Sequence, residues 1–416
     1  MEQYVQSANV GLVDSLSFSS PTVATYVTSR KQISLSAAGG DVYGPTGGAN
    51  LARFSLNTSG PFLDLSSLAI VGTLKNKSAT NPLTILGPNF GACIQSMRLI
   101  VGGVIVDSVD YSNRVESMLG FMQSESKLKM DYSEGLGYVS GDSATAFVSK
   151  PIAANASKKS VYRPKCLGSL FGQNMMPTAL VSGGSTVLEV QFVNTGAECC
   201  DDTGTNSADW EISGLSVLVD CITCDSSFLS SLGAHLAGGG SMQMSWKAYT
   251  CSFYSVLSSN MQIAHSRANS RLNTLFFSFY REGTEKTLKM CNNHYLPAQT
   301  TLKTRVQLGE ARYPDILDNG REVHFHRLLH AMGAINNVSH APCMTDTTFA
   351  TNRFIGCQDF EILPSMDHSG VNSFNSQLTL NLEGIGPADE LPTGVFIISS
   401  YDCMMELSAG GITTAV

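Results

Sequence analysis

Apolar and polar residues alternate along several short segments of the chain. The alternation is regular in Ser185–Val193, Leu215–Cys221 and Ser376–Glu383, and it has the period of a strand with one buried face. The glycine pairs Gly102-Gly103 and Gly183-Gly184 adjoin strand-like segments and predict tight turns. Short strands separated by glycine and serine predict an all-β sandwich architecture, with a few short helices in the loops between strands.

Two segments carry an apolar stripe of helical period instead. Their apolar residues stand at relative positions 0, 3, 4 and 7, which is one face of an α-helix. The two stripes lie 210 positions apart, about half the length of the chain, and this separation indicates a repeated unit. The predicted stripes consist of Val115, Met118, Leu119 and Met122 in the first half, and of Phe325, Leu328, Leu329 and Met332 in the second.

Other landmarks repeat in the same order. A strand precedes each helix, at Arg98–Gly102 and Arg305–Gly309. Further along, STVLEVQF corresponds to SQLTLNL, and a strand that ends in Asp-Cys occurs in each half. The order strand, helix, strand, strand therefore occurs twice, which predicts two domains of the same topology.

The domain boundaries follow from the intervening composition. Residues 1–45 are rich in serine, threonine and glycine without regular periodicity and are predicted to form an N-terminal arm. Three consecutive glycines near residue 239 suggest a linker at 233–243. The first domain is then expected at 46–232 and the second at 244–416. The polar, acidic segment Glu198–Trp210 is expected to be an exposed loop.

The histidines of the second helix suggest a metal site. Arg321–His330 reads REVHFHRLLH, and imidazoles at such spacings can bind one ion. On a helical wheel, however, His326, Arg327 and His330 fall on the polar flank of the helix, and no carboxylate follows within a few residues. A position at solvent or at a neighbouring chain is therefore the preferred interpretation.

Cysteine pairs are the other metal candidates. Cys199-Cys200 and the pair Cys221 and Cys224 could supply four thiolates, but Cys221 lies in an alternating strand, where an inward cysteine is an ordinary core residue. The odd total of eleven cysteines also favours reduced thiols over a disulfide framework. The sequence thus predicts no cofactor and no metal site, and the residual candidates are His326, His330, Cys221 and Cys224.

Composition favours a subunit of a larger assembly. Only 14% of the residues are charged, so much of the surface is expected to be covered by neighbours. The net charge of −8 and the lack of any basic run exclude a nucleic-acid-binding surface of the usual kind. Because no secretory signal or membrane-spanning segment is evident, the chain is expected to be made in the cell interior and not secreted.

The ordered set of segments resembles a known family. ATYVTSRKQISL, MRLIVGGVIVDSVDYSNRVESML, RVQLGEARYPDILDNGREVHFHRLL and FIISSYDCMMELSAGG are similar to parts of double jelly-roll major capsid proteins, the lineage that includes tectiviruses, adenoviruses and related small DNA viruses. The resemblance implies two tandem antiparallel jelly rolls of eight strands each.

The function implied by this resemblance is structural. A chain of this family would be a non-enzymatic capsid subunit that forms pseudo-hexameric homotrimers, the capsomers of an icosahedral shell in the virion. Its partners would be copies of itself and neighbouring capsomers, together with penton and minor capsid proteins and an internal membrane in some members.

Two other classes stay open. A single jelly-roll shell protein of a small RNA virus with a protruding β domain has similar length and composition, but its two domains would not repeat the same order of landmarks. An enzyme or carbohydrate-binding sandwich is the other class. No paired carboxylates, nucleophile constellation or phosphate-binding loop supports it.

Overall fold

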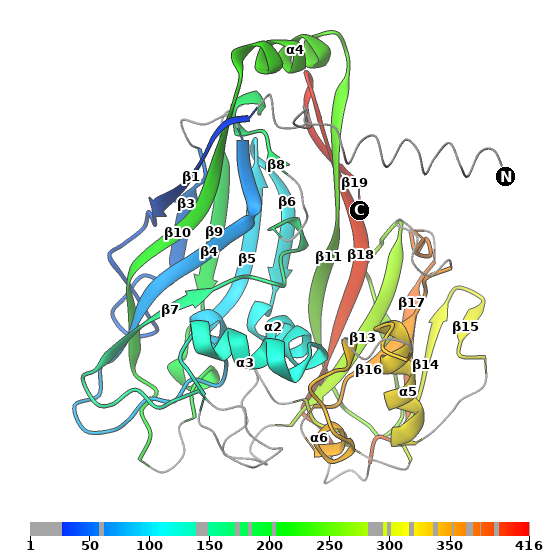
Figure 1. Ribbon diagram of the computed structural model, residues 1–416. Helices are drawn as coiled ribbons and strands as arrows, with labels where there is room; N and C mark the ends of the chain where they lie inside the picture. The colour runs from blue at the N-terminus through cyan, green and yellow to red at the C-terminus, as the bar shows by residue number, and fades with distance from the viewer. Residues whose placement is uncertain are drawn as a thin grey trace, which may run out of the picture.

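The structure, a computed structural model, consists of two β-sandwiches that lie side by side (Figure 1). The first sandwich is formed by residues 27–224 and the second by residues 241–415. The structure describes residues 27–57, 62–138, 149–170, 175–181, 185–201, 205–281, 294–297, 301–315, 320–335, 340–351, 353–362, 369–374, 376–386 and 391–415.

The first sandwich has two antiparallel sheets. Their strand orders are β1-β10-β4-β7 and β3-β9-β5-β6, with the short strands β2 and β8 added to the first sheet. The strands are β1 (Val27–Ser36), β2 (Val42–Tyr43), β3 (Leu51–Ser55), β4 (Phe62–Asn76), β5 (Ile94–Val101), β6 (Val104–Asp110), β7 (Ser157–Tyr162), β8 (Met175–Met176), β9 (Thr186–Phe192) and β10 (Trp210–Cys224). The helices are α2 (Ser112–Met122), α3 (Glu125–Glu134) and the short 3₁₀ turns η2 (Phe90–Cys93), η3 (Gly168–Leu170), η4 (Thr178–Leu180) and η5 (Gly196–Glu198).

The second sandwich also has two antiparallel sheets. Their orders are β11-β18-β13-β16 and β12-β17-β14-β15, and β19 extends the first sheet beside β18. The strands are β11 (Ser241–Ser255), β12 (Met261–His265), β13 (Leu272–Tyr280), β14 (Lys303–Leu308), β15 (Ala311–Tyr313), β16 (Gly356–Asp359), β17 (Leu378–Glu383), β18 (Gly394–Ser408) and β19 (Gly411–Ala415). The helices are α5 (Arg321–Ala331) and α6 (Asp346–Thr351).

The two sandwiches have the same topology. When β2, β8 and β19 are left out and the strands of each half are numbered from the first, both halves have sheets of order 1-8-3-6 and 2-7-4-5. Eight antiparallel strands in two sheets with long crossovers form a jelly roll. The predicted fold class, two tandem jelly rolls with short helices between strands, is therefore confirmed.

The repeated landmarks occupy equivalent positions. The hairpin β5-β6 precedes α2, and the hairpin β14-β15 precedes α5. The later landmarks are β9 with β17 and β10 with β18, the seventh and eighth strands of each jelly roll. Gly102 and Gly103 form the first hairpin turn with φ of 58° and 84°, values at which a side chain would be strained. The predicted turn at Gly183-Gly184 lies outside the described residues.

The structure moves the boundaries of the first half. β1 and β2 pair with β10, so the arm predicted at 1–45 overlaps the first sheet, and residues 1–26 lie outside the described residues. The predicted linker at 233–243 contains the end of helix α4 (Ser226–Ala237) and the start of β11. Its leucines and alanines suit a helix, and Gly238 is its C-cap. The segment predicted as an exposed loop contains three fully buried residues, Cys199, Cys200 and Trp210.

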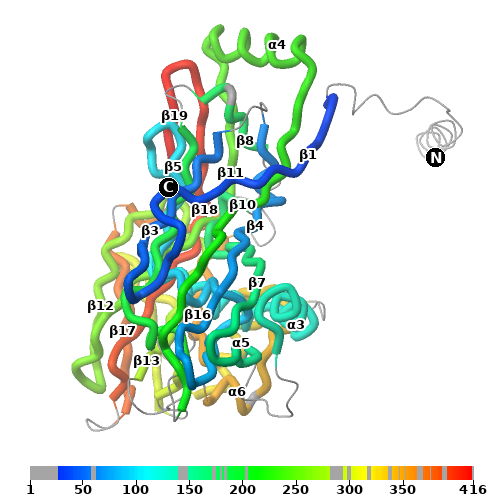
Figure 2. The backbone as a smooth tube through the Cα atoms, turned by 90° about the vertical axis from the view of Figure 1, so that its left-hand side faces the viewer, coloured from blue at the N-terminus to red at the C-terminus, as the bar shows by residue number. Residues whose placement is uncertain are grey.

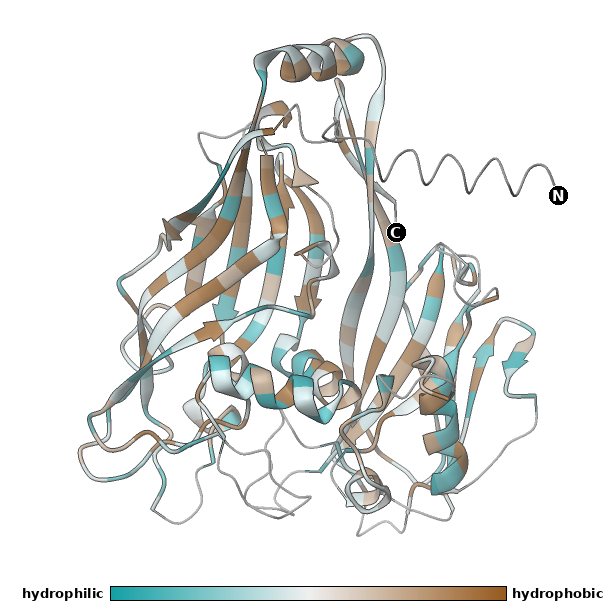
Figure 3. Cartoon of the chain, viewed as in Figure 1, coloured by the Kyte–Doolittle hydropathy of each residue, from teal (hydrophilic) through white to brown (hydrophobic). Residues whose placement is uncertain are grey.

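Buried apolar residues of both sandwiches form one continuous cluster. The apolar residues follow the strands of both halves, as the brown segments of Figure 3 show. None of the described helices is long and apolar enough to cross a lipid bilayer. Because the buried cluster continues from one sandwich into the other, packing at their contact, where α2 lies, fixes how the two sandwiches sit together.

Candidate functional site

Helix α2 of the first sandwich lies against the second sandwich (Figure 1). Its first turn is held by its own half, where the Ser112 hydroxyl donates to the carbonyl of Ile94 and the Asn113 amide donates to the carbonyl of Ala92. Val115 and Met118 are fully buried in the common core. The opposite side of the helix faces the second sandwich, so α2 is buried on two sides.

Arg114 is the centre of this contact. Its side chain is fully buried, and Nη2 donates to Ser278 Oγ at 2.8 Å and to the Phe279 carbonyl at 3.1 Å, both on β13. The guanidinium also lies over the ring of Phe396 on β18, at 4.6 Å from its centroid. A buried arginine is stable only when its charge is compensated, so the position of β13 and β18 beside α2 is strongly specified.

The last turn of α2 makes a second set of contacts. The ring of Phe121 packs edge-on against His294 at 5.6 Å and lies beneath the guanidinium of Arg353 at 4.8 Å. His294 Nε2 is 3.2 Å from the hydroxyl of Ser117, one turn earlier in the helix. Burial, followed by the charges of Arg114 and Arg353, lowers the pKa of His294 well below its usual value. His294 is therefore neutral at physiological pH.

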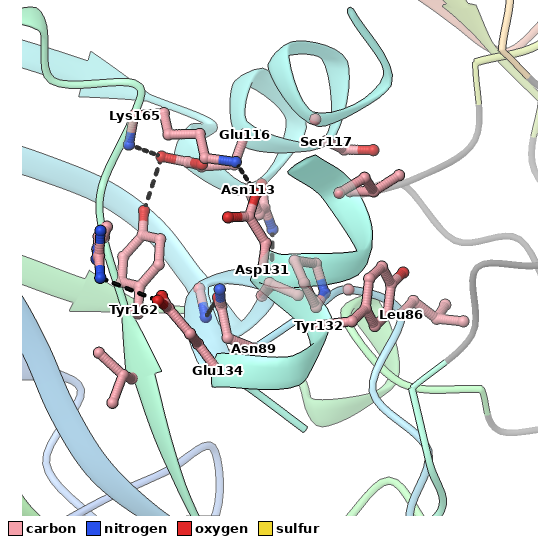
Figure 4. A pocket seen from close by; sticks show the side chains of 18 of the residues that line it. Leu86, Asn89, Asn113, Glu116, Ser117, Asp131, Tyr132, Glu134, Tyr162 and Lys165 are labelled. Carbon is pink, nitrogen blue, oxygen red and sulfur yellow. Dashed lines mark hydrogen bonds and ion pairs between the residues drawn. The ribbon is translucent and has the colours of Figure 1, made fainter. Parts of the chain in front are cut away.

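The half-buried carboxylate of Glu116 fixes α2 to its own sandwich (Figure 4). Glu116 Oε1 accepts hydrogen bonds from the hydroxyl of Tyr162 at 3.0 Å and the backbone N–H of Cys166 at 2.8 Å. The Lys165 ammonium forms an ion pair with Asp131 on α3. Burial raises the pKa of Glu116, and the positive charge of Lys165 partly opposes this effect. The network surrounds a cavity of about 60 Å³ and joins α2, α3 and β7.

Asp107 on β6 carries a buried carboxylate near the contact between the two sandwiches. Asp107 is 3% exposed, and its Oδ2 accepts the backbone N–H of Ser169 at 3.0 Å. Burial raises the pKa of Asp107 to about 6, against the opposing effect of the hydrogen bonds from Ser169. Burial and then the charge of Asp107 raise the pKa of Cys403, on β18 of the other half, to about 12. Asp107 is thus an ionisable group between the two halves.

The predicted helix stripes are placed as follows. Val115, Met118 and Leu328 are fully buried. Leu119, Met122, Phe325 and Met332 are half-buried and pack against the core, and Leu329 is also half-buried. On α5 the fully buried flank also contains His324, whose ring packs against Phe354 at 5.6 Å. The sequence interpretation overlooked this inward histidine because an imidazole was expected on the polar flank.

The residual metal candidates do not converge. His326 and His330 are exposed, and His330 Nδ1 is 3.7 Å from Asp359 Oδ2. Cys221 is buried and Cys224 half-buried, and residues three apart in a strand point to opposite faces. The described residues contain no group of three or more side chains that could hold a metal ion.

Sequence reasoning missed the residues that join the two halves. Arg114 adjoins the predicted stripe, and a single arginine on an amphipathic helix normally faces solvent. A sequence signal lay in the partner strands. β13 and β18 are nearly continuous apolar runs, LNTLFFSFY and GVFIISSYDC, and such strands are buried on both faces.

We predict that Arg114→Ala destabilises the protein by about 2 to 5 kcal/mol, because the truncation removes two hydrogen bonds from a charged donor and leaves a cavity in the core. Urea unfolding measures the change. Arg98→Ala is the matched control, since Arg98 is exposed and its ion pair with Asp110 spans 3.9 Å, so its loss should cost less than about 1 kcal/mol. Equal losses in the two variants would contradict the central role of Arg114.

We predict that Asp107→Asn stabilises the protein at pH 7 to 8. The pKa of Asp107 is raised in the folded state, so its contribution is present below pH 3.8 and is lost as the pH rises through about 6. A difference of about 2 in pKa corresponds to about 3 kcal/mol. Thermal unfolding between pH 4 and 8 should show a flatter pH dependence in this variant, whereas Asp110→Asn, an exposed change on the same strand, should retain the wild-type profile.

Comparison with known proteins identifies no relative by sequence. No protein-family model matches the chain. No curated protein matches it either. The likenesses are therefore structural only.

Three solved structures illustrate the likeness. PBCV-1 VP54, fitted into a reconstruction of the virophage Sputnik, has a TM-score of 0.65 and 11% identity, over 96% of this chain and 100% of that chain. The Faustovirus major capsid protein has a TM-score of 0.61 and 10% identity, over 94% and 91%. The Sputnik virophage structure has a TM-score of 0.55 and 9% identity, over 96% and 91%. The chain therefore has the fold of these viral proteins, a double jelly roll, along nearly its whole length.

Proposed function

We propose that the chain is a viral major capsid protein whose homotrimers are pseudo-hexameric capsomers of an icosahedral shell. One observation carries the proposal. Two jelly rolls with the same strand order lie side by side in one chain, so three copies around a threefold axis present six similar units. An outline with nearly sixfold symmetry packs into a continuous layer.

The contact between the two sandwiches of one chain is our guide to how neighbouring copies would pack against each other. The sheet β11-β18-β13 of the second half is covered by α2, and nearly all residues of β18 are buried, on both faces. The equivalent sheet of the first half is β1-β10-β4, which lies on the side of the molecule that faces the viewer in Figure 2. In a pseudo-hexamer, this sheet would be covered by α5 and β15 of a neighbouring copy.

The burial pattern of the first sheet supports this assignment. β10 alternates buried and partly exposed residues, whereas β18 does not. The outward residues of β10 include Ser216 and Leu218, and they pair with Ser36 and Ser34 on β1. The three serines of these pairs have small side chains, which leave this part of the face flat enough for close approach by another copy.

Part of the charge on the same face is paired. Arg30 on β1 forms ion pairs with Asp64 at 2.6 Å and with Asp220 at 2.8 Å, across three neighbouring strands. The one arginine offsets one of the two negative charges, which reduces the cost of removing water from the surface during association. The long β1 edge would also be protected from uncontrolled strand pairing once a neighbour covers it.

The domains and partners follow as parts of the proposal. We assign the first jelly roll to residues 27–224, the connection to α4 and its flanks, and the second jelly roll to residues 241–415. A layer of pseudo-hexamers does not close by itself, so the fivefold vertices need a separate penton protein. The net charge of −8 disfavours direct binding of the genome, which would then be contacted through minor capsid proteins or an internal membrane.

The runner-up function, a single jelly-roll shell protein with a protruding domain, is disfavoured by the topology. Its two domains would have different strand orders, whereas both halves here have the orders 1-8-3-6 and 2-7-4-5. A catalytic role has no support, since the carboxylates of Glu116 and Asp107 accept structural hydrogen bonds from Tyr162 and Ser169.

We expect the purified protein to be a trimer of about 133 kDa, three times 44.4 kDa, by light scattering. Electron microscopy should show assemblies of pseudo-hexagonal tiles. A protein that remains monomeric at all concentrations, or that builds shells from single-roll units, would contradict the proposal.

We predict that Ser34→Arg on the outer face of β1 prevents trimer formation without unfolding the subunit. A charged side chain without a partner in the covered interface should cost about 2 to 5 kcal/mol. Ser55→Arg is the matched control, because Ser55 is an equally exposed serine on β3, an edge strand of the other sheet. Light scattering should give the monomer mass for the first variant and the trimer mass for the second.

The two variants separate two kinds of failure. If the wild type and Ser34→Arg are both trimers, the chain is trimeric as proposed, but the β1-β10-β4 face is not the interface between copies. If the wild type is a monomer, the trimer itself is wrong. Circular dichroism and melting temperature establish that both variants are folded.

A further inference from the structure

We propose that Cys93 and Cys199 form an oxidation site, at which hydrogen peroxide converts the two thiols to a disulfide that ties the start of β5 to the segment between β9 and β10. The sequence analysis singled out Cys199-Cys200 as a thiolate pair, and the structure brings Cys93 to it from 106 positions away. The proposal does not depend on the capsid function.

The three sulfurs are close together and buried. Cys199 Sγ is 3.5 Å from Cys93 Sγ and 3.8 Å from Cys200 Sγ, and all three residues are fully buried. Cys93 is therefore the nearer partner. A disulfide between the adjacent residues Cys199 and Cys200 would also require a strained small ring, whereas Cys93 approaches from the 3₁₀ turn η2.

The backbone holds Cys93 and Cys199 in place. The N–H of Val193 donates to the Cys93 carbonyl at 2.9 Å, and the N–H of Leu86 donates to the Cys199 carbonyl at 2.9 Å. A disulfide has a sulfur separation of about 2.05 Å, so the sulfurs need to approach by about 1.5 Å. Rotation of the two side chains about χ1 moves their sulfur atoms by distances of this order.

Cys199 is suited to react first. Burial opposes its ionisation, but hydrogen bonds with Cys200 and Cys93 prevail and lower the pKa of Cys199 to about 5. The thiolate is the nucleophilic form of cysteine. Hydrogen peroxide is nearly as small as water, so local opening of the segment around Cys199 can admit it.

The reaction balances in two steps. The Cys199 thiolate attacks one peroxide oxygen, so that an S–O bond forms, the O–O bond breaks, and hydroxide leaves and is protonated to water. The sulfur of Cys93 then attacks the sulfenic sulfur of Cys199, the S–S bond forms, and the S–O bond breaks with release of a second water. Two thiols are oxidised and one peroxide is reduced to two waters.

The disulfide would stabilise the segment around Cys93, to which the first turn of α2 is hydrogen-bonded. The residues on either side of Cys93 accept hydrogen bonds from the first turn of α2, Ala92 from Asn113 and Ile94 from Ser112. The helix carries Arg114, the centre of the contact between the sandwiches. A bond that closes a loop of 106 positions restricts the unfolded chain strongly, so oxidation should hold this contact more firmly.

The test is peroxide treatment of the full-length protein, followed by peptide mapping under non-reducing conditions. We expect a peptide pair linked through Cys93 and Cys199 that has lost two hydrogen atoms. We also expect a melting temperature about 5 to 10 °C higher, reversed by a reducing agent. Cys200→Ser is the matched control, because it keeps the pair and should still form the link, whereas Cys93→Ser should not.

Other outcomes would overturn the proposal. A link between Cys199 and Cys200, oxidation of Cys199 to sulfinic or sulfonic acid without a link, or unreacted thiols at all three positions would each contradict it. If Cys93→Ser does not fold, mapping of the wild type decides alone, since it identifies the linked residues directly.

Discussion

The burial of α2 between two sandwiches is the constraint on which the rest of the structure depends. Arg114 has its charge satisfied by Ser278, the Phe279 carbonyl and the ring of Phe396, all on the other half of the chain. A charge buried in this way penalises any other arrangement of the two halves, because a small displacement leaves it uncompensated. The two sandwiches therefore behave as one block rather than as two domains on a linker.

The same constraint explains where apolar residues lie. β18 is a nearly continuous apolar run because its inner face meets its own core and its outer face meets α2. β10, its counterpart, alternates, and among the described residues no helix covers its outer face as α2 covers that of β18. The two halves share one topology but differ in sequence where their surroundings differ. The proposed covering of the first sheet by a neighbouring copy would account for this difference.

Ionisable and oxidisable side chains lie around α2 and the contact between the sandwiches. Glu116 accepts a hydrogen bond from Tyr162 at the end of β7. Asp107 is an ionisable carboxylate whose charge acts on Cys403 of β18. Cys93 and Cys199 lie where the first turn of α2 is attached. Protonation of Asp107 and the proposed oxidation of Cys93 and Cys199 would therefore act at different places near the contact between the sandwiches.

The sequence by itself determined the architecture. Alternation of period two in Leu215–Cys221, the glycine turn at Gly102-Gly103 and the two helix stripes 210 positions apart predicted two tandem β-sandwiches, and the family resemblance implied that each is a jelly roll. Only the tertiary structure decided which residues join the halves. Arg114, His294 and Cys93 acquire their roles from residues more than a hundred positions away, and the pattern around each of them describes only its own helix, loop or strand. The start of the first sheet was misjudged for the same reason. β1 is an exposed edge strand whose pairing with β10 leaves little trace in its own residues.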